Sequence, residues 1–482
     1  MERLAKAAIE RGLALGASYV DARVERIASE TLVVRNDRLN EVSAREEFGL
    51  AVRALVGGAF GFAAAPLSVE DAGAARALAE RAVALARVLA PARTRPVELS
   101  EEPAAVGEYR TPVAIDPFAL RDAEKLEPLR AACAELGKRP EVSVREASFA
   151  CRSRVQWFAS SEGAAFHQEL VRTGGGIAAT ATAGGEVATR SWPASFGGDH
   201  QPGGFERVLE FDLLGHAPRV REEAVELCAA PPCEAGSRDL ILASNLLMLV
   251  IHETVGHATE LDRALGCEAD LAGHSFATVD KRGSLLYGSP WVELVADSLA
   301  PGGLDTRGID DEGVRSQRWP LVHAGRFVDF QSSREWAFAL EAKKSHGGAR
   351  AQSWYHPPIV RITNVSLEPG AWDLDALIAD TADGIVCDGV KMWSIDEARR
   401  NFQFTAELGW ELRGGKRVRL VRTPTFTGDT LEFWRACDAV CDASHFRMWG
   451  VTNCGKGNPI QEAEMSHGAS PARFRRVRFL AG

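Results

Sequence analysis

Apolar and polar residues alternate over short stretches in the first half of the chain, as they do in half-buried β-strands. Residues 20–25 read Val-Asp-Ala-Arg-Val-Glu, which is a period of two. Asn36-Asp37 and Gly57-Gly58 interrupt this pattern, and both pairs form turns readily because they tolerate positive φ. The pattern predicts further strands at 31–35, at 49–56 and through most of 142–198.

Longer stretches with one apolar face predict helices between these strands. Ser68 is expected to cap one of them, with Asp71 three residues on as its partner, and Asp116-Pro117 is expected to start another. Gly137 should end the latter helix. The predicted helices cover residues 1–16, 68–90, 116–137 and 205–228, so the first half is predicted to be α/β.

The second half has a different pattern. We expect a buried strand at 239–243 and a helix from Asn245 to about Leu265, capped by Ser244. Beyond Asp270 the sequence predicts short strands and turns, with one helix near 374–379. Pro231-Pro232 marks the expected domain boundary, which gives an α+β protein with domains 1–232 and 233–482 and a possible subdomain crossing near 91–115.

Composition narrows the class of protein. The chain has 482 residues, enough for two or three hydrophobic cores, and 46% of them are hydrophobic. Its formal net charge is −10 without a long Lys/Arg block, which argues against a nucleic-acid partner. The longest strongly apolar run, 246–251, is too short to span a membrane, and no signal peptide is apparent. We therefore expect a cytoplasmic protein with its nine scattered cysteines mostly reduced.

The helix expected after Ser244 carries the candidate chemistry. It continues from an apolar run into His252-Glu253-Thr254-Val255-Gly256-His257. The two histidines are five residues apart, or about 140° around an ideal helix, so one metal ion could take both only if the helix is distorted, for instance by a π-bulge. Gly256 is the residue type that would permit such a distortion. The alternative is two histidines that bind backbone carbonyls beside an unrelated glutamate.

The same hexapeptide resembles the HExxxH motif of the TldD/PmbA family of metalloproteases, also called the modulator-of-DNA-gyrase family. Residues 451–457 (VTNCGKG) are similar to the family's CGK segment, whose cysteine is the third metal ligand. Weaker similarities lie at 49–53, 57–62, 306–313, 361–364 and 466–474. Residues 423–449 and the three residues before Cys454 look divergent.

The resemblance implies a zinc metallopeptidase of the catalytic TldD type. His252, His257 and Cys454 would hold one Zn²⁺ per chain, with another divalent metal as an alternative. Two imidazoles and a thiolate leave a fourth position for water, and Glu253 would act as the catalytic base. The implied fold has two domains, the second mostly antiparallel β with one metal-binding helix. Implied partners are flexible or unfolded peptide substrates and a dimer, either with itself or with a motif-lacking PmbA/TldE-type subunit.

Two other functions stay open at this point. The chain could be a metal-binding regulatory or partner subunit of such a complex without peptidase activity of its own. It could also hydrolyse a non-peptide amide at the same site. Intact Glu253 argues against the first, because holding a metal does not need that residue.

Other residues have both a functional and a structural interpretation. Glu260 and Asp262 could hold the imidazoles or lie on the surface. Cys437, Cys441 and His445 could form a second metal face, although ordinary helix positions are favoured. Asp310, Asp311 and Glu312 could capture the amino terminus of a peptide or form a solvated turn. His467 and Arg473 could line the cleft or fix the end of the chain.

Overall fold

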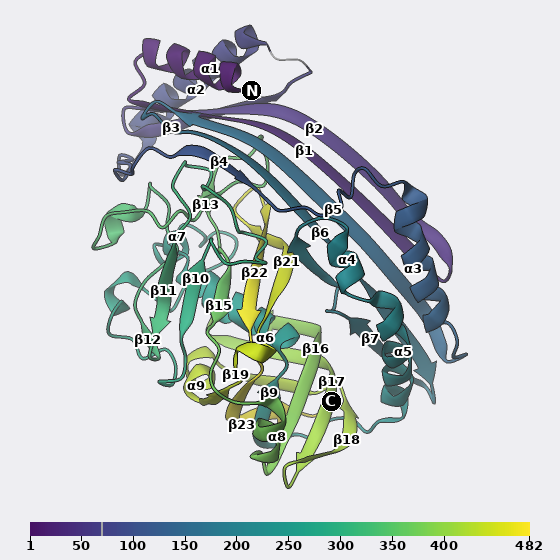
Figure 1. Ribbon diagram of the computed structural model, residues 1–482. Coiled ribbons are helices and arrows are strands. Elements are labelled where there is room, and N and C mark those ends of the chain that lie inside the picture. Colours follow the sequence, from purple (N-terminus) through teal and green to yellow (C-terminus); the bar gives the residue numbers. More distant parts are fainter. Residues whose placement is uncertain (69–70) are drawn as a thin grey trace.

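The computed structural model describes residues 1–68 and 71–482. Its most extended element is a curved sheet of eight strands that arches over the rest of the molecule (Figure 1). The strands are β1 (Tyr19–Arg35), β2 (Arg38–Val56), β3 (Ala59–Pro66), β4 (Val106–Arg110), β5 (Val142–Ser160), β6 (Ala165–Ala183), β7 (Glu186–Trp192) and β8 (Asp199–Pro202). Their order is β3-β2-β1-β5-β6-β4, with β7 and β8 also paired to β6.

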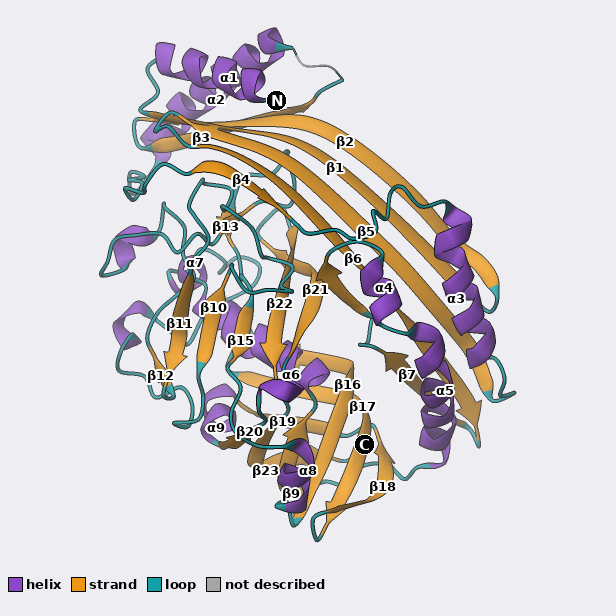
Figure 2. Cartoon of the chain, viewed as in Figure 1, coloured by secondary structure: helices purple, strands orange, loops and turns teal. Residues whose placement is uncertain are grey.

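Helices cover the outer face of this sheet at its two ends (Figure 2). At one end, α1 (Glu2–Ala14) and α2 (Ala72–Leu89) bury alanine and leucine faces against β1 and β2. At the other end, α3 (Asp122–Leu136) and α5 (Leu213–Ala229) pack on β5 and β6, and α4 (Glu206–Glu210) precedes α5. Each end therefore has a hydrophobic core of its own.

Three features of this half differ from the sequence prediction. The strands expected at 20–25 and 31–35 form one strand, β1. Asp71, not Ser68, caps α2, since its carboxylate accepts the amide of Gly73 at 2.7 Å. Helix α3 begins at Asp122, because Asp116 uses its side chain in a local turn with the amide of Phe118.

The second half is built on a seven-stranded sheet that lies below the arch. Its order is β16-β9-β23-β19-β17-β18, with β20 beside β23, and β16 also pairs with β17, so that part of the sheet closes on itself. Strands β9 and β16 run parallel, and the other pairs are antiparallel. The strands are β9 (Gly236–Leu242), β16 (Asp383–Ile395), β17 (Asn401–Arg413), β18 (Lys416–Arg422), β19 (Thr425–Asp429), β20 (Cys437–Val440) and β23 (Ala472–Leu480).

Smaller sheets and short helices complete this half. One sheet contains β10 (Leu294–Asp297), β11 (Arg318–His323), β12 (Arg326–Phe327) and β15 (Val365–Leu367). Two hairpin-like pairs are β13 (Ala349–Arg350) with β14 (Ile359–Val360), and β21 (Arg447–Lys456) with β22 (Gln461–Ala469). The helices are α6 (Ser244–Ile251), α7 (Leu261–Ala264), α8 (Leu374–Ala379) and α9 (Thr430–Arg435). The α+β class and the mostly antiparallel second half are thus confirmed.

The short helix α6 lies at the centre of the second half, and its apolar residues belong to the largest hydrophobic core (Figure 2). That core also contains residues of the closed sheet and of β10, β11, β15 and β22. Among the described residues, no helix is both long and apolar enough to cross a membrane. The fold therefore places the end of α6, where the candidate residues begin, deep inside the protein.

Candidate metal centre

The helix that carries the histidines is distorted at the predicted place. Helix α6 ends at Ile251 and continues as a π-helical turn, His252–Gly256, and then as a 3₁₀ turn, His257–Thr259. The amide of His257 donates to the carbonyl of His252, which is the i to i+5 bond of a π-turn. This turn brings residues five apart onto one side of the helix, which a regular α-helix would not do. The continuous helix expected to Leu265 is thus replaced by these turns and α7.

Side chains bind the backbone around the π-turn. The hydroxyl of Thr259 donates to the carbonyl of Val255 at 2.9 Å, and Gln331 Nε2 donates to the carbonyl of Gly256 at 2.8 Å. Gly256 has φ −51°, a value open to any residue, so its role is not the conformational freedom that the sequence suggested. A Cβ there would lie 2.9 Å from Cδ1 of Ile362, which shows that glycine is needed for close packing.

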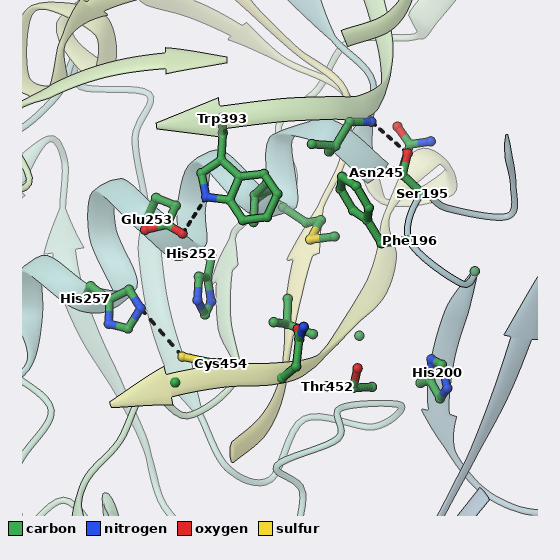
Figure 3. A pocket seen from close by; sticks show the side chains of 18 of the residues that line it. Ser195, Phe196, His200, Asn245, His252, Glu253, His257, Trp393, Thr452 and Cys454 are labelled. Carbon is green, nitrogen blue, oxygen red and sulfur yellow. Dashed lines mark hydrogen bonds between the residues drawn. The ribbon is translucent and has the colours of Figure 1, made fainter. Parts of the chain in front are cut away.

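Cys454 reaches the same point from β21. The pairing of β21 with β22 shifts register between Val451 and Cys454, and the Cys454 side chain is buried. Its Sγ lies 3.5 Å from Nε2 of His257, as Figure 3 shows. One ligand atom from each of His252, His257 and Cys454 lies within 4.8 Å of the other two. Among the residues that the structure describes, no other group of three His, Cys, Asp or Glu side chains comes close enough together to hold a metal ion.

Hydrogen bonds fix which nitrogen of each imidazole is free. His467 Nδ1 donates to the carbonyl of Val365 at 3.0 Å, so its Nε2 accepts from His252 Nδ1 at 2.8 Å. His257 Nδ1 donates to a carboxylate oxygen of Glu260 at 2.9 Å. Because Nδ1 of each ring is engaged in these hydrogen bonds, Nε2 is the nitrogen that His252 and His257 can offer to a metal.

Electrostatics favour the same protonation states. Burial lowers the pKa values of His252 and His467, the latter well below its ordinary value, and so keeps both rings neutral. Burial by itself raises the pKa of the Cys454 thiol, but His257 and Arg361 outweigh it and hold that pKa below the usual range. Two imidazoles and a thiol inclined to ionise form the donor set that a zinc-like metal prefers.

The group that holds Nδ1 of His257 is the buried carboxylate of Glu260. Glu260 is fully buried, and Lys456 Nζ lies 3.1 Å from one of its carboxylate oxygens. Burial raises the pKa of Glu260, but Lys456 and His257 together bring it well below the ordinary value, so it stays a carboxylate. Asp262 instead accepts from Lys456 at 2.7 Å, so of the two candidates only Glu260 contacts an imidazole.

Glu253 points toward the cavity from the π-turn, beside His252 (Figure 3). Trp393 Nε1 donates to one carboxylate oxygen at 2.9 Å, and Arg399 donates to the other at 2.8 Å. Burial raises the pKa of Glu253, but His252, His257, Arg399 and Trp393 hold it below its ordinary value. Glu253 is therefore an oriented carboxylate with both oxygens hydrogen-bonded.

The cavity beside these residues has a volume of about 320 Å³ and is lined from both halves of the chain. Ser195, Phe196, Gly198 and His200 come from the loop after β7 and from β8. The other lining residues come from α6, the π-turn, the 3₁₀ turn at His257, β16, β21 and Arg399. Trp393, Arg399 and Phe196 could not be found from the sequence, because no motif connects them to the histidines.

The remaining candidate residues have structural surroundings. Cys437 lies on strand β20 and not on a helix, so the expected spacing on one helix face was wrong. His445 follows in a 3₁₀ turn and lies 3.3 Å from a carboxylate oxygen of Asp373. Arg473 binds Asp438 at 2.9 Å and does not line the cavity.

The acidic triplet is buried, so the expected solvated turn was wrong. Asp311 contacts Arg154 at 3.0 Å, Glu312 contacts Arg53 at 3.0 Å, and Asp310 accepts the amide of Val314 at 2.9 Å. Burial and the nearby Glu312 carboxyl raise the pKa of Asp310 to about 7. The triplet joins the second half to the arched sheet and lies outside the lining of the cavity at His252.

Family models decide the relationship of the chain to known proteins. Residues 235–477 match the PmbA/TldA metallopeptidase C-terminal domain, and residues 20–86 match domain 1 of the same metallopeptidases. The chain belongs to the TldD/PmbA family. The fold and the converging residues described above are thus those of a member of a metallopeptidase family.

Individual relatives agree with this assignment. A protein of Methanocaldococcus jannaschii named as a metalloprotease is 26% identical over 449 residues, which cover 93% of this chain and 94% of the relative. A Saccharolobus solfataricus protein named as a zinc metalloprotease and TldD homolog is 22% identical over 48% of this chain and 49% of its own length.

Two solved structures share the fold. One is described as a modulator of a DNA gyrase from Thermotoga maritima and has a TM-score of 0.77 at 16% identity, covering 99% of this chain and 100% of that chain. The other is TldE from Thermococcus kodakarensis, with a TM-score of 0.73 at 17% identity, again covering 99% and 100%. At this identity the likeness concerns the fold alone.

Proposed function

We propose that this TldD/PmbA chain is a zinc metallopeptidase that hydrolyses flexible or unfolded peptides. The observation that carries the proposal is the convergence of two imidazoles, each with Nδ1 held by a hydrogen bond, on the Cys454 thiol. We assign His252, His257 and Cys454 as the ligands. The name of the Saccharolobus solfataricus relative supports zinc over other divalent metals.

Zinc held by His252, His257 and Cys454 would supply a Lewis acid for the hydrolysis. Glu253 accepts the proton of the attacking water and returns it to the leaving amine, the role for which its fixed carboxylate is suited. Trp393 and Arg399 orient that carboxylate through its two oxygens. His467 and Glu260 hold the imidazoles in the tautomer that presents Nε2. The cavity of about 320 Å³ admits a few residues of an extended chain but no folded domain.

We further propose that the chain acts as a dimer, either with itself or with a TldE-type subunit. The likeness to the fold of TldE supports this pairing, since two chains of one fold can form matching interfaces. Native mass spectrometry of the purified chain tests it. A dimer supports self-pairing, a monomer that becomes a heterodimer with a TldE-type chain supports the second form, and a monomer under both conditions contradicts the proposal.

The test of the function compares metal content with peptide cleavage. Elemental analysis of wild type and Cys454→Ala is paired with cleavage of a random peptide mixture by wild type and Glu253→Gln. About one zinc per wild-type chain is expected, with less in the cysteine variant. Cleavage is expected to be lost in the glutamate variant while its zinc is retained. Metal without cleavage would favour a regulatory subunit, and cleavage of small amides alone would favour an amidase.

A further inference from the structure

One wall of the cavity is apolar and is formed by two aromatic side chains from different halves of the chain. Phe196 is 67% exposed and Trp393 is 40% exposed, and their ring centroids lie 5.7 Å apart in an edge-on arrangement. Figure 3 shows the two rings side by side, with Phe196 between Trp393 and Ser195. Further apolar lining residues are Met248, Leu249, Val390 and Val451.

This wall is adjacent to the proposed base. The indole nitrogen of Trp393 donates to Glu253 at 2.9 Å, so its ring lies between Phe196 and the Glu253 carboxylate. A side chain that fills the space against both rings therefore belongs to a substrate residue near the bond under attack.

The structure holds Phe196 in place against its own backbone preference. Phe196 has φ +58°, a left-handed conformation that is unfavourable for residues other than glycine. The preceding residue, Ser195, donates to Glu407 at 2.8 Å and accepts the amide of Val390 at 2.9 Å. At Gly198 the loop passes so close to β6 that a Cβ would lie 1.9 Å from the carbonyl oxygen of Gly175. Exposed aromatic rings held in this way are typical of recognition sites.

The charges around the cavity disfavour a charged occupant of this space. Among the described residues that line the cavity, Glu253 carries the carboxylate and Arg399 carries the guanidinium. These two groups form an ion pair with each other at 2.8 Å. A charged substrate side chain against Phe196 would lose water without gaining a free partner. An apolar side chain would gain from burial against both rings.

We propose that Phe196 and Trp393 form a subsite that selects an aromatic or large aliphatic substrate residue next to the scissile bond. The proposal rests on the peptidase function proposed above and names its substrate class. Phe196 is a specificity-determining residue in this account, whereas Trp393 both lines the subsite and orients Glu253.

The first experiment maps cleavage sites in a random peptide mixture by mass spectrometry, with metal-loaded full-length protein. Wild type is expected to enrich aromatic and large aliphatic residues at one position beside the cut. Phe196→Ala should lower this enrichment about tenfold, a typical loss for a truncated apolar pocket. Phe338→Ala is the matched control, since Phe338 is an exposed phenylalanine outside the cavity. Unchanged enrichment in Phe196→Ala, or charged residues at that position in wild type, would overturn the proposal.

The second experiment measures peptide binding at the subsite without catalysis. Binding of alanine decapeptides with one central Phe or one central Asp is measured by calorimetry on Glu253→Gln and on Glu253→Gln/Phe196→Ala. The Phe peptide should bind about tenfold tighter than the Asp peptide to the first variant, and the difference should largely vanish in the second. If this holds but wild type cuts no peptide, the peptidase function fails and the subsite stands. If wild type cuts peptides but neither variant distinguishes the two decapeptides, the subsite fails and the function stands.

Discussion

Each imidazole of the candidate centre has one neighbour that fixes its Nδ1 atom, and the two neighbours differ in chemistry. His257 donates to the carboxylate of Glu260, whereas His252 donates to another neutral imidazole, His467. A carboxylate partner raises the basicity of the ring that it holds, but a neutral imidazole mainly fixes tautomer and orientation. At this scale the site therefore depends on residues that never touch the metal.

His467→Ala is expected to weaken metal binding without removing a ligand. Loss of the acceptor at 2.8 Å frees the His252 ring to rotate and to change tautomer, which typically costs about 10- to 100-fold in metal affinity. Competition with a chromophoric zinc chelator measures the affinity. His445→Ala is the control, because His445 is partly exposed, pairs with Asp373 and does not line the cavity. Equal affinity in both variants would contradict the role assigned to His467.

At the scale of elements, the π-turn is the feature that lets one short helix present both histidines. Its sequence predicted the distortion, since a five-residue spacing is incompatible with a shared site on a regular helix. Gly256 adds close packing, because its Cα faces Ile362 without room for a methyl group.

Gly256→Ala is expected to destabilise the fold by about 1–3 kcal/mol through overpacking. The Cβ would lie 2.9 Å from Cδ1 of Ile362. Ile362→Val removes that atom, so the double variant should lose less free energy of unfolding than the sum of the two single variants. Urea unfolding of all four proteins measures the cycle. Strict additivity would show that the Ile362 contact is not the reason for glycine.

The secondary-structure elements also show which features can be predicted from the sequence. Alternation and turn pairs predicted most strands of the arched sheet, although β4 falls in the segment 91–115 that was expected to be a crossing. The five-residue spacing predicted the π-turn, because both patterns depend on local geometry. Residues such as Trp393 and His467 lie 140 and 215 positions from their partners Glu253 and His252, and the closed sheet and the β21–β22 pair bring them there. No local pattern encodes such contacts. Burial of the acidic triplet was missed for the same reason, and the domain boundary at 232/233 stays a prediction.

At the scale of the whole molecule, buried ion pairs join the arched sheet to the second half. Asp311 contacts Arg154 of β5 at 3.0 Å and Arg23 of β1 at 3.7 Å. At a separate contact, the loop that carries Phe196 reaches the second half, where Ser195 donates to Glu407 at 2.8 Å, and this loop completes the lining of the cavity.

Asp311→Asn is expected to cost about 3–5 kcal/mol of stability at pH 7, because it leaves buried guanidinium charge uncompensated. Burial by itself raises the pKa of Asp311, but Arg154 and Arg23 bring it well below its ordinary value. Its contribution is therefore fully present above the unfolded pKa of about 3.9 and is lost as pH falls through the folded pKa. Urea unfolding from pH 7 to pH 3.5 should show the gap between wild type and variant shrinking below about pH 4. A gap that is constant or that widens toward acid would contradict this assignment.

The central claim is that this chain cuts peptides with a metal held by His252, His257 and Cys454 and with Glu253 as the base. The most direct measurement determines zinc content and peptide cleavage together on wild type, Cys454→Ala and Glu253→Gln. About one zinc per wild-type chain is expected, with less zinc in the cysteine variant and full zinc without cleavage in the glutamate variant. Wild-type protein that binds no metal, or a glutamate variant that cleaves as fast as wild type, would contradict it.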